Sequence, residues 1–125
     1  MSKSLYIREG KGMKILVIIS TAGSEREGWK IGRRLVESRL AACVNVIPKV
    51  RSFFYWEGKV RGEQEVILVI KTMQKQFQKI INEIKKIHTY EVPEIISLRV
   101  DGGEEKYLNW VKKNVSERVN EAPAH

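Results

Sequence analysis

A long β-forming stretch followed by a tight turn constrains the fold of this chain most. Residues 41–56, AACVNVIPKVRSFFYW, are rich in strand-forming residues, and Glu57-Gly58 offers a two-residue turn into a second such run, KVRGEQEVILVIKT. About sixteen extended residues at roughly 3.3 Å each span on the order of 50 Å, more than one domain of this size needs across its sheet. We therefore expect a long hairpin that projects from the domain or bends at Pro48.

The segments around this hairpin alternate between strand and helix patterns. Before it, the run MKILVIIST at 13–21 predicts a buried strand, and Ser24 with Glu27 has the spacing of a capping box at a helix start. After it, a helical apolar stripe is expected to follow a cap at Thr72, and then EVPEIISLRV predicts a strand. A turn at 101–103 is expected to start the last helix.

This order predicts an α+β fold. Strand, helix, strand, strand, helix, strand is the βαββαβ order of the ferredoxin-like split βαβ arrangement, here with an added C-terminal helix. It implies an antiparallel sheet that carries two helices on one face. We expect an N-terminal extension at 1–12, a single domain at 13–115 and a C-terminal tail at 116–125.

The bulk properties of the chain exclude several classes of protein. No apolar run approaches the length of a membrane span and no signal peptide is evident, so we expect a cytoplasmic protein without membrane contact. The net charge is +8, but its lysines and arginines recur on the polar arcs of the expected helices, which indicates solvated faces rather than a nucleic-acid surface. No catalytic motif is present, and we expect no enzyme activity.

Five sequence blocks, in order, resemble the CutA family of divalent-cation tolerance proteins. The blocks are Leu40-Ala41-Ala42-Cys43-Val44-Asn45, Pro48, Tyr55-Trp56-Glu57-Gly58-Lys59, His88-Thr89-Tyr90-Glu91-Val92-Pro93-Glu94 and Tyr107-Leu108-Asn109-Trp110. The resemblance runs from about Met13 to Val115. It implies a homotrimer in which the hairpin strands pair across subunits, and it links the chain to tolerance of copper and other divalent cations. The residues expected at the oligomer interface are Phe53, Phe54, Tyr55 and Trp56.

The candidate metal ligands are His88, Glu91 and Cys43, with Glu94 close to them in the sequence. Imidazole suits copper, and carboxylates suit harder cations. Family members credited with a copper site have a cysteine and two histidines where this chain has Ser20, Ile87 and His88, so only one of the three ligand-type residues is retained. The alternative for His88 is a buried packing residue at a helix end, and Cys43 between apolar neighbours fits packing as well.

A second functional hypothesis is a sensor of small molecules. PII-type signalling proteins are also trimers of ferredoxin-like protomers with long hairpins, and clefts between their subunits suit anionic ligands. His88 is a further candidate for such a cleft. The other residues expected to line it are Arg51, Tyr55, Trp56, Lys59 and Tyr90.

Overall fold

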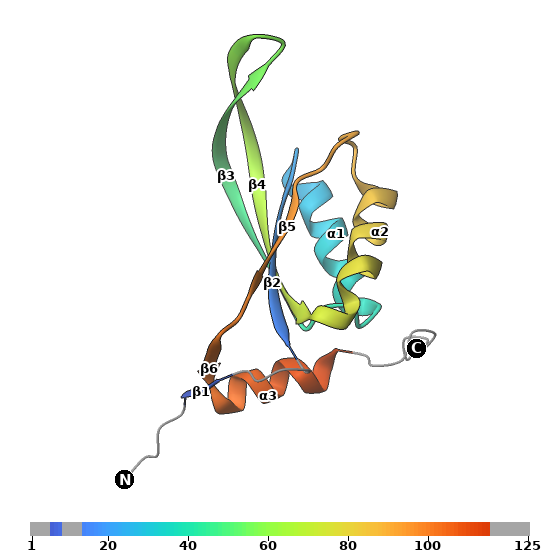
Figure 1. The fold of residues 1–125 in the computed structure, drawn as a ribbon. Helices are drawn as coiled ribbons and strands as arrows, with labels where there is room; N and C mark the ends of the chain where they lie inside the picture. Colours follow the sequence, from blue (N-terminus) through green and yellow to red (C-terminus); the bar gives the residue numbers. More distant parts are fainter. Residues whose placement is uncertain (1–5, 9–13, 116–125) are drawn as a thin grey trace.

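An antiparallel four-stranded sheet organises the computed structural model, which describes residues 6–8 and 14–115 of the chain (Figure 1). Its strands lie in the order β3-β4-β2-β5. Their bounds are Ile15–Ala22 for β2, Cys43–Trp56 for β3, Lys59–Met73 for β4 and Ile95–Arg99 for β5. Strands β2 and β4 are central, and their aliphatic residues make the sheet apolar on both faces.

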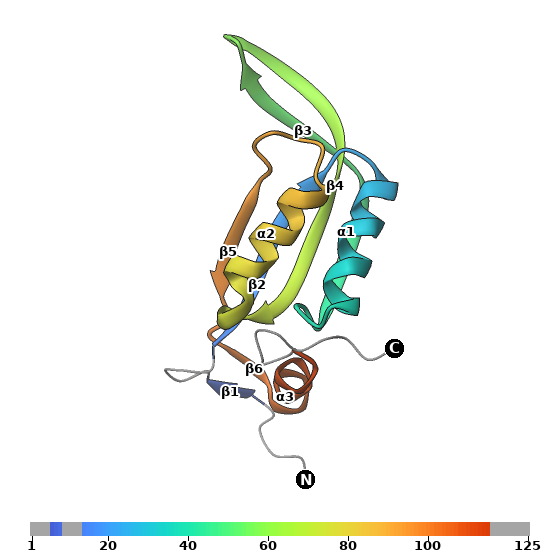
Figure 2. The same ribbon diagram turned by 90° about the vertical axis from the view of Figure 1, so that its right-hand side faces the viewer.

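Two helices cover one face of this sheet (Figure 2). They are α1 at Glu25–Glu37 and α2 at Phe77–Ile87, the latter entered through a 3₁₀ turn, η1, at Gln74–Gln76. Ile18, Leu68 and Ile70 point toward the helices and are fully buried in the main core. The predicted α+β class, with antiparallel strands and helices on one face of the sheet, is confirmed.

Close approach of α1 to the sheet depends on a missing side chain. Gly28 is buried in α1, and a Cβ built there would lie 2.8 Å from Cγ2 of Val66 on β4. Because a valine in a packed core has little room to move, this position accepts only glycine without a shift of the helix.

The β3–β4 hairpin is long and projects beyond the helices (Figure 1). Its register shifts between the pair Ile47↔Ile67 and the pair Val50↔Glu65, so β3 carries one extra residue there. Lys49, inside this bulge, has φ of 60°, a conformation that favours glycine. The predicted projection and irregularity at Pro48 are both confirmed.

The turn at the tip of the hairpin has the expected form. Glu57 and Gly58 have φ of 51° and 77°, and positive φ at both central residues matches the right-handed twist of the strands.

A second, two-stranded sheet differs from what the sequence led us to expect. Strand β1, at Tyr6–Arg8, comes from the segment expected to precede the domain, and it pairs with β6 at Gly102–Glu104. The glycines 102 and 103 therefore lie in a strand and not in a turn. A Cβ at position 102 would collide with the carbonyl oxygen of Ile7, so glycine allows the two strands to approach. The tail expected at 116–125 lies outside the described residues.

Helix α3, at Glu105–Asn114, packs beside this small sheet. Its N-cap is Glu104, whose side chain accepts a hydrogen bond from the backbone N–H of Tyr107 at 2.7 Å. Leu108 and Val111 are buried in a second apolar cluster with Met73. None of the helices in the described part of the chain is long and apolar enough to span a membrane.

The start of α2 also corrects a prediction. Thr72 does not cap this helix but lies in β4, fully buried, where its Oγ1 donates to the carbonyl oxygen of Leu40 at 2.6 Å. Strand β4 continues through Met73 because that residue belongs to the second apolar cluster. The sequence has the pattern of a helix cap at Thr72, but the Thr72 hydroxyl instead donates its hydrogen bond to the buried carbonyl of Leu40.

The face of the sheet that points away from α1 and α2 is called here the open face. It is mainly apolar, and its two outermost residues on β5 are exposed by 53% (Ile96) and 57% (Leu98). Cross-strand pairing places further apolar residues of the open face beside them, Val17, Ile19, Ile47, Ile67 and Val69. Cys43, Asn45 and Lys71 lie on the same face. Helix α3 packs against the end of this face at Ile15 and Met73, and within the described residues no helix covers the rest of it.

Candidate functional site

A cleft of about 900 Å³ lies where the hairpin leaves the sheet, on the side of the open face. It is bordered by the end of β2, by both hairpin strands and by the loop that joins α2 to β5. The lining residues are Thr21, Ser52, Phe53, Phe54, Trp56, Arg61, Glu63, Glu65, Tyr90, Glu91, Val92 and Glu94. We call this the glutamate cleft.

The two strands of the hairpin deliver side chains to this cleft in cross-strand pairs. Glu63 lies opposite Ser52, and Arg61 lies opposite Phe54. Residues directly opposite each other in an antiparallel pair share one face, so alternate residues of β4 reach the cleft together. Glu65 continues this row toward the body of the sheet and is only 9% exposed.

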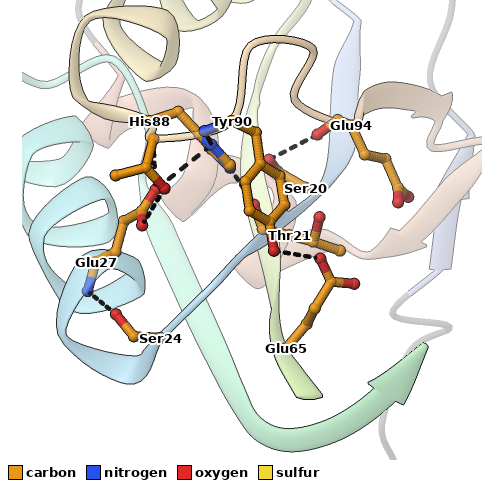
Figure 3. Close-up of polar contacts among 9 residues, drawn as sticks. Ser20, Thr21, Ser24, Glu27, Glu65, His88, Tyr90 and Glu94 are labelled. Carbon is orange, nitrogen blue, oxygen red and sulfur yellow. Dashed lines mark hydrogen bonds and ion pairs between the residues drawn. The ribbon is translucent and has the colours of Figure 1, made fainter. Parts of the chain in front are cut away.

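The loop that follows α2 is held in place by a buried histidine (Figure 3). The His88 side chain is fully buried, its Nε2 lies 2.6 Å from the carbonyl oxygen of Thr21, and its Nδ1 accepts from the Tyr90 N–H at 3.0 Å. A carbonyl can only accept, so Nε2 carries the proton and Nδ1 is the acceptor. Both nitrogens of the neutral ring are thus occupied by the backbone.

Glu27 of α1 fastens the same loop from the other side (Figure 3). Its carboxylate accepts from the backbone N–H and from Oγ1 of Thr89, both at 3.0 Å. The predicted capping box is half correct: Ser24 accepts from the N–H of Glu27 at 3.1 Å, but the Glu27 side chain binds the loop instead of reaching back. Together these bonds set where Glu91 and Glu94 lie.

Tyr90 joins this loop to the hairpin. Its hydroxyl donates to Oε2 of Glu65 at 2.8 Å, as Figure 3 shows. Burial, followed by the hydrogen bond to Glu65 and the negative charges of Glu65, Glu27 and Glu63, raises the pKa of Tyr90 to about 12. The hydroxyl is therefore a neutral donor at physiological pH.

The charge of the cleft is opposite to that of the chain. Four glutamates and one arginine line it, a formal charge of −3 when all five are ionised, whereas the whole chain carries +8. A concave surface lined by carboxylates concentrates cations and repels anions. The sequence had suggested clefts between subunits for anionic ligands, whereas this cleft within one chain has the charge that suits cations.

Two of the residues predicted to line a cleft, Trp56 and Tyr90, do line this one. Arg51 and Tyr55 are not part of the lining, and they lie opposite Gln64 and Val60, on the other face of the hairpin. Lys59 lies opposite Trp56 near the tip but is not part of the lining. His88 sits behind the loop and presents no side-chain surface.

The predicted metal ligands do not come together within one chain. Glu91 lines the cleft, but Cys43 lies opposite Lys71, toward the other end of the sheet from the Thr21 that His88 contacts. His88 would have to break a backbone hydrogen bond before it could bind a metal ion. Among residues 6–8 and 14–115, no group of three or more His, Cys, Asp or Glu side chains is arranged to hold one.

All four residues predicted for an oligomer interface are partly exposed in the chain. Phe53 and Tyr55 are exposed by 70% and 77%, and Phe54 and Trp56 by 39% and 56%. Gly62 lies opposite Phe53, and a Cβ there would approach Cε1 of the Phe53 ring to 3.0 Å. The absence of a side chain at Gly62 thus leaves room for that ring across the hairpin.

Sequence reasoning missed the acidic residues of β4. The segment Arg61-Gly62-Glu63-Gln64-Glu65 places charged residues at every second position, which in a strand puts them on one face. This alternation alone could have predicted that Arg61, Glu63 and Glu65 lie on one face of the strand. Nothing in the sequence, however, indicated that Glu27 binds the loop 62 residues further along the chain.

The comparisons with known proteins agree on one family. The family model "CutA1 divalent ion tolerance protein" matches residues 16–114. The chain is 41% identical over 98 residues to the "Divalent-cation tolerance protein CutA" of Thermus thermophilus, covering 78% of this chain and 95% of that protein. It is 37% identical over 114 residues to "Protein CutA, chloroplastic" of Arabidopsis thaliana, covering 90% of this chain but 63% of that longer protein.

Solved structures give the same result. The crystal structure of CutA1 from Oryza sativa superposes with a TM-score of 0.83 at 34% identity, covering 87% of this chain and all of that one. The divalent cation tolerance protein from Thermus thermophilus superposes with a TM-score of 0.80 at 39% identity, covering 82% and 99% of the two chains. Sequence and structure therefore point to one family over most of the chain.

Proposed function

Because the chain belongs to the CutA1 divalent ion tolerance family, we propose that it is a homotrimer that binds divalent cations, copper(II) most tightly, in clefts between its protomers. The observation that carries this proposal is the sign of the glutamate cleft, which is acidic in a basic chain. The cleft suits cations, and so supports this function over a sensor of anionic metabolites.

The open face supports the assembly. It presents aliphatic residues that the described chain leaves exposed, and β5 is an edge strand with two exposed apolar side chains, Ile96 and Leu98. A surface of this kind is typical of a protein–protein interface. We further propose that each protomer is ferredoxin-like, since the strand order β3-β4-β2-β5 fits that topology.

The carboxylates supply the cation ligands. Glu63, Glu91 and Glu94 are exposed along the cleft, and oxygen donors suit divalent cations. Their number within one chain does not complete a site, so a neighbouring protomer would add the remaining ligands. For a given set of oxygen and nitrogen donors, copper(II) has the highest affinity among the first-row divalent cations, so we expect it to bind most tightly.

We propose binding rather than catalysis as the role of the cleft. Its hydroxyl-bearing residues besides Tyr90 are Thr21 and Ser52, and neither is accompanied in the lining by a histidine that could serve as a base. His88, the nearest histidine in the described chain, has both ring nitrogens bound to backbone groups.

Calorimetric titration with copper(II), zinc(II) and magnesium(II) tests the cation site. We expect the Glu91→Gln, Glu94→Gln double variant to bind copper about tenfold more weakly, since two charged ligands are lost. The matched control is Glu37→Gln, Glu105→Gln, which removes the same charge from helices outside the cleft. Equal copper affinity in the two double variants would contradict the assigned site.

Sedimentation equilibrium at micromolar concentration tests the assembly. We expect a mass of three chains for the wild type. A Leu98→Glu variant places a charge on the open face and is expected to sediment as a monomer, whereas Glu37→Gln on α1 should leave the trimer intact. A monomeric wild-type protein would refute the proposed assembly.

A further inference from the structure

A groove of about 410 Å³ lies between α1 and α2, on the side of the sheet opposite to the open face (Figure 2). We call it the helix groove. Its four basic side chains and two carboxylates give a formal charge of +2. The four-stranded sheet separates it from the open face and from the glutamate cleft, so a neighbouring protomer on the open face would leave it accessible. The lining residues are Lys30, Arg33, Arg34, Glu37, Glu83, Lys86 and Ile87.

Glu83 of α2 holds two of these basic side chains in place. Its carboxylate accepts from Nε of Arg34 on α1 and from Nζ of Lys86 on its own helix, both at 3.1 Å. The Glu83 side chain is 16% exposed, whereas those of Arg34 and Lys86 are 58% and 70% exposed. Burial raises the pKa of Glu83, but the hydrogen bonds and charges of Lys86 and Arg34 together lower it below its usual value. The carboxylate is therefore ionised at neutral pH and fixes two cations across the groove.

The basic groups keep hydrogen-bond donors that these contacts do not use. Arg34 binds Glu83 through Nε, which leaves its two Nη groups, and one of the three N–H bonds of the Lys86 ammonium reaches Glu83. Lys30 lies one helical turn before Arg34 on the same side of α1, and within the described residues it forms no ion pair. Three cationic groups from two helices thus surround one fixed carboxylate.

We propose that the helix groove binds a linear polyphosphate, either alone or as the triphosphate of a nucleotide, between Lys30, Arg34 and Lys86. A guanidinium pairs with two phosphate oxygens at once, and each ammonium binds a further oxygen as a point charge. Because Glu83 already holds Arg34 and Lys86, less side-chain freedom is lost on binding. The groove volume lies within the range of small-molecule sites. This inference does not rest on the proposed function, since the two sites lie on opposite sides of the sheet.

Calorimetric titration in metal-free buffer tests the ligand class with tripolyphosphate, ATP and citrate. Near-physiological salt is used because it screens diffuse attraction to a basic surface. We expect saturable binding of tripolyphosphate at one site per chain, and about tenfold weaker binding of citrate, whose charges are not carried by phosphoryl groups. ATP distinguishes the two sources. Affinity equal to or above that of tripolyphosphate supports a nucleotide, and lower affinity supports a polyphosphate without a nucleoside.

Two variants locate the site. Arg34→Lys keeps the charge but removes the guanidinium fork, and should weaken tripolyphosphate binding about tenfold. Lys30→Gln removes one cation and should weaken it about fivefold. The matched control Lys75→Gln removes one positive charge from the turn before α2, outside the groove lining, and should bind as the wild type does. Circular dichroism confirms the fold of each variant, and if Arg34→Lys does not fold, Lys30→Gln and the three probes decide the result.

The inference is overturned if tripolyphosphate gives no saturable binding or if citrate binds as tightly. It is also overturned if Arg34→Lys and Lys30→Gln lower the affinity no more than Lys75→Gln does, because binding would then reflect only the net charge of the chain. Separate copper titrations distinguish the two proposals. Tripolyphosphate binding without copper binding refutes the proposed function alone, copper binding without tripolyphosphate binding refutes this inference alone, and the absence of both refutes both.

Discussion

The two faces of the four-stranded sheet are both mainly apolar, but they differ in what covers them. Ile18, Leu68 and Ile70 lie under α1 and α2 and are fully buried. On the open face, Ile96 and Leu98 remain about half exposed. One face therefore stabilises the protomer, whereas the other can contribute its full hydrophobic free energy only when another molecule covers it. This difference leads to predictions that separate folding from assembly.

The largest effect is expected from the covered face. Leu68→Ala leaves a cavity beneath the helices and should lower the free energy of unfolding by about 3 to 4 kcal/mol. Because the site is enclosed by its own chain, the loss should not depend on protein concentration. Urea unfolding at two protein concentrations measures this, and a loss below about 1 kcal/mol would be incompatible with the packing described.

The next largest effect is expected at His88, at the start of the loop that joins α2 to β5. His88→Ala leaves the Thr21 carbonyl and the Tyr90 N–H without their partner and opens a buried space, which should cost about 2 to 3 kcal/mol. If His88 were instead a copper ligand, the variant would lose copper binding with little loss of stability. Urea unfolding in the absence of metal, together with copper calorimetry, distinguishes these outcomes.

A smaller effect, dependent on pH, is expected at Tyr90. The pKa of its hydroxyl is raised to about 12 from the usual 10, so the folded state holds the proton more tightly than the unfolded state does. The contribution to stability is complete below pH 10 and is lost as the pH rises from 10 to 12. Tyr90→Phe should cost about 1 kcal/mol at pH 8, and its difference from wild type should shrink across that window. A difference that stays constant up to pH 12 would argue against this proton linkage.

The smallest effect on the protomer itself is expected from Leu98→Ala, the open-face counterpart of Leu68→Ala. It removes a half-exposed side chain and should cost less than about 0.5 kcal/mol at low protein concentration, where the protomers are separate. At high concentration the loss should grow, because Leu98 then contributes to the interface of the assembled protein. A loss as large as that of Leu68→Ala at every concentration would mean that the two faces do not differ in the way described.

Strand and helix order could be read from the sequence because it depends on local patterns. The alternation of apolar residues in β4 and the stripe in α2 are visible without any knowledge of partners. Strand β1 could not be foreseen, since a three-residue strand is stabilised here by its pairing with β6 almost one hundred residues away. The role of Thr72 could not be predicted for the same reason, because its hydroxyl binds the buried carbonyl of Leu40 instead of capping a helix.

The candidate site was predicted only in part for a similar reason. Tyr90, Trp56 and Glu91 were identified through a resemblance to a family, and they do line the cleft. The acidic character of the cleft comes from two separate elements, β4 and the loop between α2 and β5, whose convergence is a property of the fold and not of any short motif. His88 was identified, but its hydrogen bonds give it a positioning role that no spacing in the sequence reveals.

The extra residue in β3 at the bulge has a consequence for how this chain tolerates change. Before the bulge the odd-numbered residues of β3 lie on the open face, and beyond it the even-numbered ones do, so Phe54 and Trp56 lie on the open-face side of the hairpin and Phe53 and Tyr55 on the opposite side. Deleting Lys49 would remove the extra residue and leave the pairs Ile47↔Ile67 and Val50↔Glu65 in place, so Phe54 and Trp56 would stay on the side of the cleft. The face that each aromatic residue presents is thus set by its pairing with β4, and the bulge is a place where β3 can lose one residue without exchanging them.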